Sequence, residues 1–105
     1  MIKIAREIGM PKGYFVSAHR READPEKRAA YLKLAGPALQ KYEGKMLAST
    51  NKIKVFENGM AQQTVIIEFE TYQKAVDFID SEDYQNALKA LDGGADRDCR
   101  VFEGV

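Results

Sequence analysis

The most regular alternation of apolar and polar residues lies between residues 64 and 69. An apolar residue at every second position is typical of a strand with one buried face. Val65, Ile67 and Phe69 form the apolar face here, and Ile66 and Glu68 lie on the other. Thr71 then has the residue type of a helix N-cap, and apolar residues recur after it at helical spacing. The pattern predicts a central strand of a sheet, followed by a helix that packs on it through Tyr72, Ala75, Val76 and Ile79.

An earlier strand is predicted over residues 13–20. Its more apolar set, Tyr14, Val16 and Ala18, is expected to face the helices, with Phe15, Ser17 and His19 on the opposite face. Asp24-Pro25-Glu26 begins a helix, because it supplies a capping carboxylate, a first-turn proline and an acid near the positive end of the helix dipole. The stripe expected to be buried is Tyr31, Leu34, Ala35, Ala38 and Tyr42. Gly36-Pro37 predicts a kink or a restart, and Gly44 the end of the helix.

The remaining elements follow from shorter patterns. Residues 46–56 predict one strand interrupted near Thr50-Asn51, and Asn58-Gly59 favours a tight type I′ hairpin that pairs this strand with the central one. Ser81 caps a further helical segment that ends at residues 92–94 and carries Tyr84, Leu88 and Leu91. Residues 97–103 form a last strand, with Cys99 and Val101 on one face and Asp98, Arg100 and Phe102 on the other.

The order strand, helix, strand, strand, helix, strand predicts an α+β fold. With right-handed crossovers it gives the ferredoxin-like βαββαβ arrangement, a four-stranded antiparallel sheet with its helices on one face. The other face would expose Phe15, Phe56, Ile66 and Phe102, together with polar residues. Since an exposed apolar face of this size favours association, we expect two copies to pair face to face as a homodimeric α+β barrel. Residues 12–105 are expected to form this single domain, and residues 1–11 an N-terminal extension; Met10 is a second candidate start.

Composition limits the classes of function. In 105 residues, 16 basic and 16 acidic side chains cancel, which argues against a nucleic-acid partner and against binding to anionic lipid. No apolar run is long enough for a membrane span or a signal peptide. The single cysteine, Cys99, is expected to be a buried apolar residue, which fits a reducing cytoplasm. One histidine and one cysteine without clustered spacing predict no metal site, and no motif indicates a cofactor.

Several short motifs, in this order and spacing, resemble the family known as domain of unknown function 1330. They are Lys12-Gly13-Tyr14, Asp24-Pro25-Glu26, Tyr31, Lys41-Tyr42-Glu43-Gly44-Lys45, Val65-Ile66-Ile67-Glu68-Phe69 and Ser81-Glu82-Asp83-Tyr84-Gln85. The resemblance runs from about Lys12 to Glu103. It implies a dimeric α+β barrel, the superfamily that also holds small monooxygenases, muconolactone isomerases and stress-responsive barrel proteins. It implies no reaction and supplies no catalytic residues, since one fold hosts many functions.

Two side chains are candidate proton acceptors. His19 is the only histidine, and its reference pKa lies near neutrality. Glu68 is a carboxylate among apolar neighbours on the predicted open face. Antiparallel pairing of their strands would place the two roughly 13 Å apart at about 3.3 Å per residue, so they form no dyad within one chain. Asp98 is the expected neighbour of His19, and Arg100 or Lys54 the structural partner of Glu68. The competing interpretation of His19 is a simple structural or solvent-contacting role at the end of its strand. For the tyrosines it is a ring in the core with the hydroxyl in contact with water.

Two functional hypotheses remain. In the first, the protein is a small cytoplasmic homodimer that binds an apolar or aromatic molecule between its sheet and helices. Alternatively, it binds no small molecule and interacts only with a partner. In the second, it is a cofactor-independent enzyme of the monooxygenase or isomerase kind, with Glu68 or His19 as general base. The predicted ligand-binding residues are Phe15, Ser17, Phe56, Ile66, Arg100 and Phe102. An enclosed cavity that contains one of the two bases would favour the enzyme.

Overall fold

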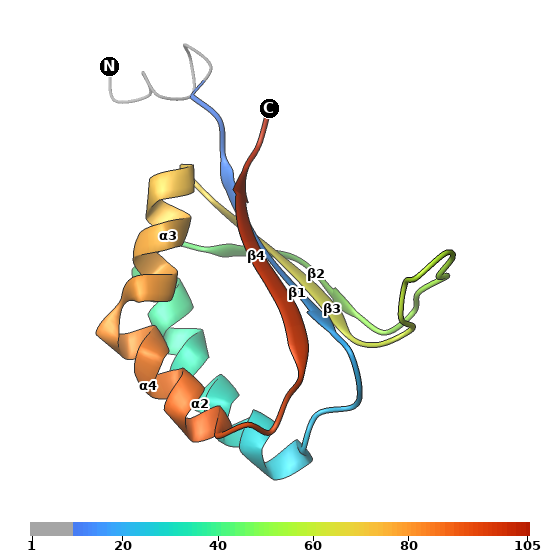
Figure 1. Ribbon diagram of the computed structural model, residues 1–105. Helices are drawn as coiled ribbons and strands as arrows, with labels where there is room; N and C mark the ends of the chain where they lie inside the picture. The colour runs from blue at the N-terminus through green and yellow to red at the C-terminus, as the bar shows by residue number, and fades with distance from the viewer. Residues whose placement is uncertain (1–9) are drawn as a thin grey trace.

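The computed structural model describes residues 10–105. Residues 1–9 of the predicted N-terminal extension lie outside the described residues. The elements occur in the predicted order (Figure 1). They are β1 Gly13–His19, α2 Pro25–Lys41, β2 Lys45–Thr50, β3 Thr64–Phe69, α3 Tyr72–Asp80, α4 Glu82–Leu91 and β4 Arg97–Glu103. None of the helices in this part of the chain could span a membrane.

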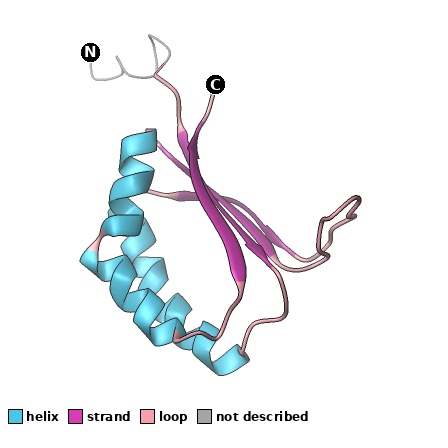
Figure 2. Cartoon of the chain, viewed as in Figure 1, coloured by secondary structure: helices cyan, strands magenta, loops and turns pink. Residues whose placement is uncertain are grey.

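The four strands form one antiparallel sheet in the order β2-β3-β1-β4, and the helices cover one of its faces (Figure 2). The predicted fold class is therefore confirmed. The core lies between the helices and the inner face of the sheet, where α3 and α4 bring an aromatic cluster against β1 and β3. Phe78 is at its centre, with ring centroids 5.2 Å from Phe69 and 4.7 Å from Tyr84.

The three predicted helix caps are confirmed. The Asp24 carboxylate accepts a hydrogen bond from the backbone N–H of Lys27, at 3.0 Å. The hydroxyls of Thr71 and Ser81 do the same for the N–H groups three residues on, at 3.1 Å in both cases. Each cap satisfies an N–H that has no partner within its helix, and so fixes where the helix begins.

Helix α2 passes through Pro37 as one continuous helix, so the predicted restart is wrong. Because proline has no backbone N–H, the Lys33 carbonyl loses its helical hydrogen bond. Pro37 and Lys33 both lie on the exposed side of the helix, where that carbonyl can bind water. The end of α2 is a Schellman motif, in which the Gly44 N–H donates to the Leu39 carbonyl at 3.0 Å. Glu43 takes the left-handed conformation, with φ 56°.

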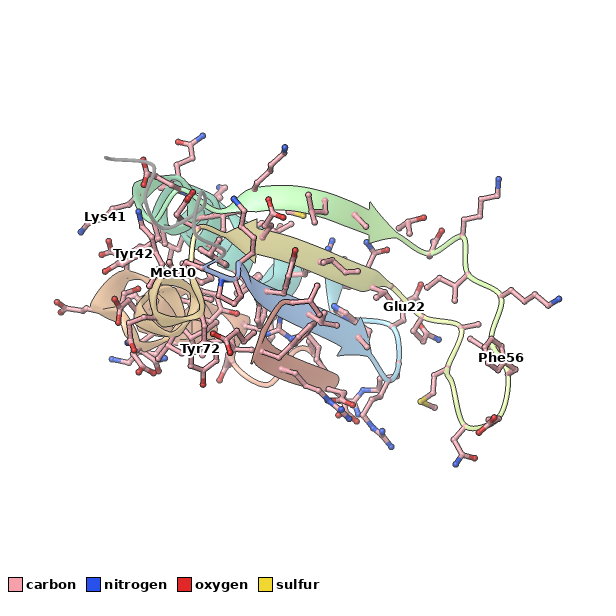
Figure 3. The ribbon with its side chains drawn as sticks, turned by 90° about the horizontal axis from the view of Figure 1, so that it is seen from above. Met10, Glu22, Lys41, Tyr42, Phe56 and Tyr72 are labelled. Atoms are coloured by element: carbon pink, nitrogen blue, oxygen red, sulfur yellow. The ribbon has the colours of Figure 1, made fainter. Side chains whose placement is uncertain are left out.

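The connection between β2 and β3 differs from the prediction. β2 ends at Thr50, and residues 51–63 form a loop instead of a longer strand and a type I′ turn at Asn58-Gly59. Local bonds occupy backbone groups that a ladder would need: the Gln62 N–H donates to the Met60 carbonyl at 2.8 Å. The loop projects beyond the strands and carries Phe56 exposed near its end (Figure 3).

The predicted faces of β1 are reversed. Phe15, Ser17 and His19 face the helices and are at most 5% exposed, whereas Tyr14 and Val16 lie on the open face. The prediction assumed that the more apolar set packs inward, but the inward set borders a cavity that accommodates polar groups. Cys99 is also exposed rather than buried, because β4 is the outer strand of the sheet.

Candidate functional site

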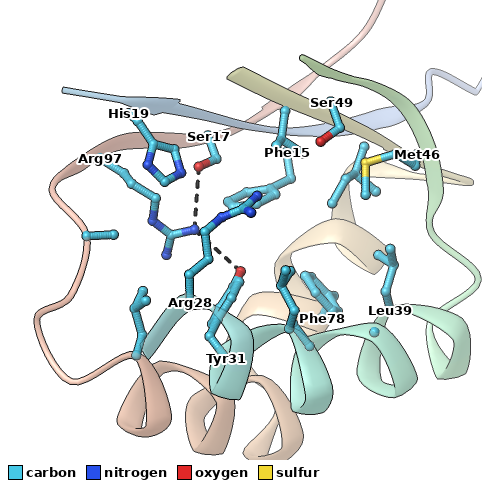
Figure 4. A pocket seen from close by; sticks show the side chains of 17 residues that line it. Phe15, Ser17, His19, Arg28, Tyr31, Leu39, Met46, Ser49, Phe78 and Arg97 are labelled. Atoms are coloured by element: carbon cyan, nitrogen blue, oxygen red, sulfur yellow. Dashed lines mark hydrogen bonds between the residues drawn. The ribbon is translucent and has the colours of Figure 1, made fainter. Parts of the chain in front are cut away.

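A cavity of about 310 Å³ lies between the inner face of the sheet and helix α2 (Figure 4). All four strands and all three helices contribute to its wall. The strand residues are Phe15, Ser17, His19, Met46, Ser49, Val65, Ile67 and Arg97, and the others are Arg28, Tyr31, Leu32, Ala35, Gly36, Leu39, Phe78, Leu91 and Ala95. This volume is at the lower end of the range of small-molecule sites, so it suits a small ligand.

One part of the cavity is apolar. Phe15 and Phe78 meet edge to face, with centroids 6.5 Å apart, and aliphatic side chains from α2 and β3 surround them. Leu32 and Met46 are about half exposed, so the cavity opens between α2 and the edge strand β2. A flat apolar group that entered there would lie against aromatic and aliphatic walls.

The other part is basic. Arg97 at the start of β4 and Arg28 on α2 both reach into the cavity (Figure 4). The Arg97 Nη1 donates to Ser17 Oγ and to the Tyr31 hydroxyl, each at 3.4 Å. The guanidinium carbon of Arg97 also lies 5.1 Å from the centre of the Tyr31 ring. These neutral contacts aim Arg97 and leave its other N–H groups for a ligand.

A buried pair of tyrosines supports this part of the wall. The Tyr31 and Tyr84 hydroxyl oxygens are 2.8 Å apart, and the rings meet edge to face. Burial, together with the neighbouring Tyr31, raises the pKa of Tyr84 far above its usual range. The Tyr84 phenol therefore stays neutral, and the two hydroxyls link α2, α4 and Arg97.

His19 lies at the basic end, directly opposite Arg97 in the pairing of β1 with β4. Burial, then the positive charges of Arg97 and Arg28, lower the pKa of His19, against a backbone hydrogen bond with Arg21. The imidazole is thus neutral at neutral pH. The His19 side chain lines the cavity, so a bound molecule can contact the imidazole.

The charge of the two arginines is not balanced within the site. Among the described residues, no carboxylate oxygen lies within 4 Å of Arg28 or Arg97. The two acids that flank Arg97 in sequence contact other arginines: Asp96 contacts Arg20 and Arg21, and Asp98 pairs with Arg100. Unpaired cations beside apolar walls are costly, so this end of the cavity favours an anion.

A second, more polar cavity of about 490 Å³ shares His19 and Arg28 with the first. It runs from the start of α2 to the loop between β2 and β3, where Gln62 and Gln63 line it. The basic groups therefore lie at the junction of the two spaces. Within residues 10–105, no three potential metal ligands of the histidine, cysteine or carboxylate kind converge.

The structure brings only part of the predicted site together. Phe15, Ser17 and His19 line the cavity, although from the face opposite to the predicted one. Ile66, Glu68, Arg100 and Phe102 lie on the open face of the sheet, and Phe56 lies on the projecting loop.

The predicted partners of the two bases are also wrong. Glu68 accepts a hydrogen bond from the Tyr14 hydroxyl at 3.2 Å, and Arg100 pairs with Asp98 at 3.1 Å. His19 and Glu68 form no dyad, as predicted, but the reason is that their strands direct them to opposite faces of the sheet.

Sequence reasoning missed Arg28 and Arg97. Arg28 precedes Tyr31 by three residues and Ala35 by seven, so helical spacing already places it on the buried stripe of α2. Arg97 precedes Cys99 by two residues, and period two places it on the inner face of β4. The signal was present in both elements, but neither arginine was among the predicted site residues.

The fold and the site identify the structural class of this protein. A ferredoxin-like sheet with one helix-covered face and a cavity beneath it is the protomer of the dimeric α+β barrel fold. The family model called domain of unknown function (DUF1330) matches residues 12–105, and the chain belongs to this family. A comparison with curated proteins finds no match.

Three solved structures illustrate the likeness of fold. RPA0582, a protein of unknown function from Rhodopseudomonas palustris, has a TM-score of 0.70 at 16% identity, over 99% of this chain and 92% of that one. SnoaB, a cofactor-independent oxygenase from Streptomyces nogalater, has a TM-score of 0.55 at 10% identity, over 90% and 92%. A dimeric ferredoxin-like protein of unknown function from Thermobifida fusca YX has 0.52 at 13%, over 90% and 92%. At such identities the likeness shows the fold and no more.

Proposed function

We propose that this protein binds a small organic anion with an apolar or aromatic body in the cavity between its sheet and α2. The observation that carries the proposal is the pair of arginines, Arg28 and Arg97, which face an apolar cavity without a carboxylate partner among residues 10–105. A carboxylate suits this site, because a guanidinium presents N–H groups in a planar fork that matches two carboxylate oxygens.

The two parts of the cavity set the orientation of the ligand. Its charged group would lie between the arginines and beside Ser17, and its body would extend toward Phe15 and Phe78. The entrance between α2 and β2 would admit the body from the side. The neutral His19 adds a hydrogen-bonding nitrogen at the charged end.

Calorimetric titration with phenylacetate and with its neutral amide tests this proposal. We expect the acid to bind and the amide to bind at least about 10-fold more weakly, since a hydrogen bond to a charged group contributes roughly 1.5–3 kcal/mol. Arg97→Met keeps the length of the side chain, removes the charge, and should lose the preference for the acid. Lys33→Met is the matched control, because Lys33 is exposed on α2 and does not line the cavity. Equal binding of acid and amide to the wild type would refute the proposal.

We further propose that two copies pair through the open face of the sheet. No helix within residues 10–105 covers this face (Figure 1). It carries a stacked pair, Tyr14 and Phe102, with ring centroids 5.7 Å apart, beside Val16 and Ile66. Phe102 is 44% exposed in the single chain. Pairing would remove this apolar surface from water, which is the main driving force of protein association.

Sedimentation equilibrium at micromolar concentration tests the pairing. We expect a dimer for the wild type and a monomer for Ile66→Asp, which places a charge in the middle of the proposed interface. Phe56→Asp is the control, because Phe56 is equally apolar but lies on the loop outside the sheet. A wild-type chain that sediments as a monomer would contradict the proposal.

A further inference from the structure

We infer that the cavity also catalyses a reaction, the keto–enol interconversion of a 2-oxo acid with an apolar or aromatic side chain, in which His19 carries the proton. This inference rests on the proposed function, because the substrate belongs to the class of anions that the arginines would bind. It adds one thing to binding: a base placed beside the group that would stabilise the developing charge.

His19 lies next to a cation at the basic end of the cavity. It is directly opposite Arg97 across the β1–β4 pair, and both side chains point to the inner face of the sheet. Directly opposed residues in an antiparallel pair have Cβ atoms roughly 4.5–5.5 Å apart. A small group held by Arg97 is therefore within reach of the imidazole. Arg28 reaches the same end of the cavity from α2 (Figure 4).

A general base must carry no proton on the accepting nitrogen before the reaction begins. The His19 imidazole lines the cavity, so a bound molecule can reach the ring nitrogen that carries no proton. The charges that face the ring are both positive, Arg97 from β4 and Arg28 from α2. Burial of the ring, and then these two charges, lower the pKa of His19, so the imidazole is unprotonated at neutral pH, as a general base requires.

The reaction places a negative charge on an oxygen of the substrate. When a proton leaves the carbon next to the ketone, the electron pair of the C–H bond forms a C=C bond and the carbonyl oxygen becomes an enolate oxygen. Two guanidinium groups are present at this end, so one can hold the carboxylate while the other donates to the enolate oxygen. The Ser17 and Tyr31 contacts of Arg97 fix its position before the substrate arrives.

The reaction balances without any further reagent. The proton moves from the carbon to the unprotonated ring nitrogen of His19. The imidazolium then gives this proton to the enolate oxygen, which forms the enol. The reverse sequence restores the ketone. No electrons are gained or lost overall, so neither an oxidant nor a reductant is needed. The apolar wall formed by Phe15 and Phe78 would hold the side chain of the substrate away from water.

Phenylpyruvate in deuterated water provides the test. Exchange of its methylene protons for deuterium, followed by proton NMR, measures the abstraction step, and line broadening in the same sample measures binding. We expect the wild type to accelerate exchange beyond the protein-free rate. His19→Gln should reduce the acceleration by about 100-fold or more, the usual contribution of a general base, and should change the affinity for phenylpyruvate by less than about threefold. His19→Asn is a second variant for use if the first does not fold.

The control is Glu68→Gln. Glu68 lies on the opposite face of the sheet, where it contacts Tyr14, so this variant should exchange phenylpyruvate at the wild-type rate. Binding without accelerated exchange would overturn the catalytic inference and leave the binding proposal standing. Undiminished exchange in His19→Gln would remove His19 as the base and overturn it as well. Absence of both binding and exchange would contradict both proposals.

Discussion

The hydroxyl pair of Tyr31 and Tyr84 predicts an ordered set of stabilities. The two oxygens are 2.8 Å apart in the core, and the Tyr31 hydroxyl also accepts a hydrogen bond from Arg97. Tyr84→Phe removes one buried hydrogen bond but leaves the Tyr31 hydroxyl in contact with Arg97, so the expected loss is about 1 kcal/mol. Tyr31→Phe removes a partner from Tyr84 and a partner from the charged guanidinium, and we expect a loss of about 2–3 kcal/mol.

The double variant separates this explanation from a general loss of packing. Once both hydroxyls are gone, neither tyrosine leaves the other unsatisfied, so the double variant should cost about 1 kcal/mol less than the sum of the single ones. Urea denaturation at one fixed protomer concentration measures all four proteins, since the apparent stability of an oligomer depends on concentration. Losses that add within about 0.5 kcal/mol, or a larger loss for Tyr84→Phe, would refute the reasoning.

Three further predictions concern other parts of the fold. In thermal denaturation, Gly13→Ala should destabilise the protein by about 1–3 kcal/mol, because the new Cβ would lie 2.4 Å from the Thr71 carbonyl oxygen. Gly36→Ala is the contrasting variant: its new Cβ would have no atom within 4 Å, and it should stabilise α2 by about 0.5–1 kcal/mol. Since the pKa of His19 is lowered in the folded chain, the unfolded chain binds its proton first as the pH falls below about 6.5, so stability should decrease there; His19→Gln should flatten that part of the profile of melting temperature against pH, and an unchanged slope would contradict this. Cys99 should react completely with a thiol reagent in the native protein; protection until denaturation would mean that β4 is covered.

The order of elements could be predicted from the sequence because each boundary has a local cause. Asp24, Thr71 and Ser81 cap their helices through contacts within three residues, and such contacts do not depend on the rest of the fold. The loop after β2 could not be predicted in the same way. Residues 52–56 have the composition of a strand, but hydrogen bonds within turns fix the conformation of the residues that follow them. Composition alone does not show whether strand pairing or the local turns will be more stable.

The site was harder to predict than the fold, for a physical reason. Period two divides β1 into two sets of residues but does not say which set faces inward when neither is purely apolar. The inward set includes Ser17 and His19 because it borders a cavity that also contains two arginines, and the cavity exists only when α2 and β4 come together. A base and a cation that are far apart in sequence become neighbours through this pairing.

Gly13 has a consequence for the chemistry of the protein, although it lies away from the cavity. It stands under the first turn of α3, where any side chain would meet backbone atoms of Thr71 and Tyr72 within 2.7 Å. Only a glycine fits there, so β1 cannot slide by one position past its neighbours without placing Lys12 or Tyr14 at that crossing. Such a slip would turn Ser17 and His19 outward and line the cavity with Val16 and Ala18, so that the two arginines would face methyl groups in place of a hydroxyl and an imidazole. A residue with no side chain thus dictates which functional groups the interior displays.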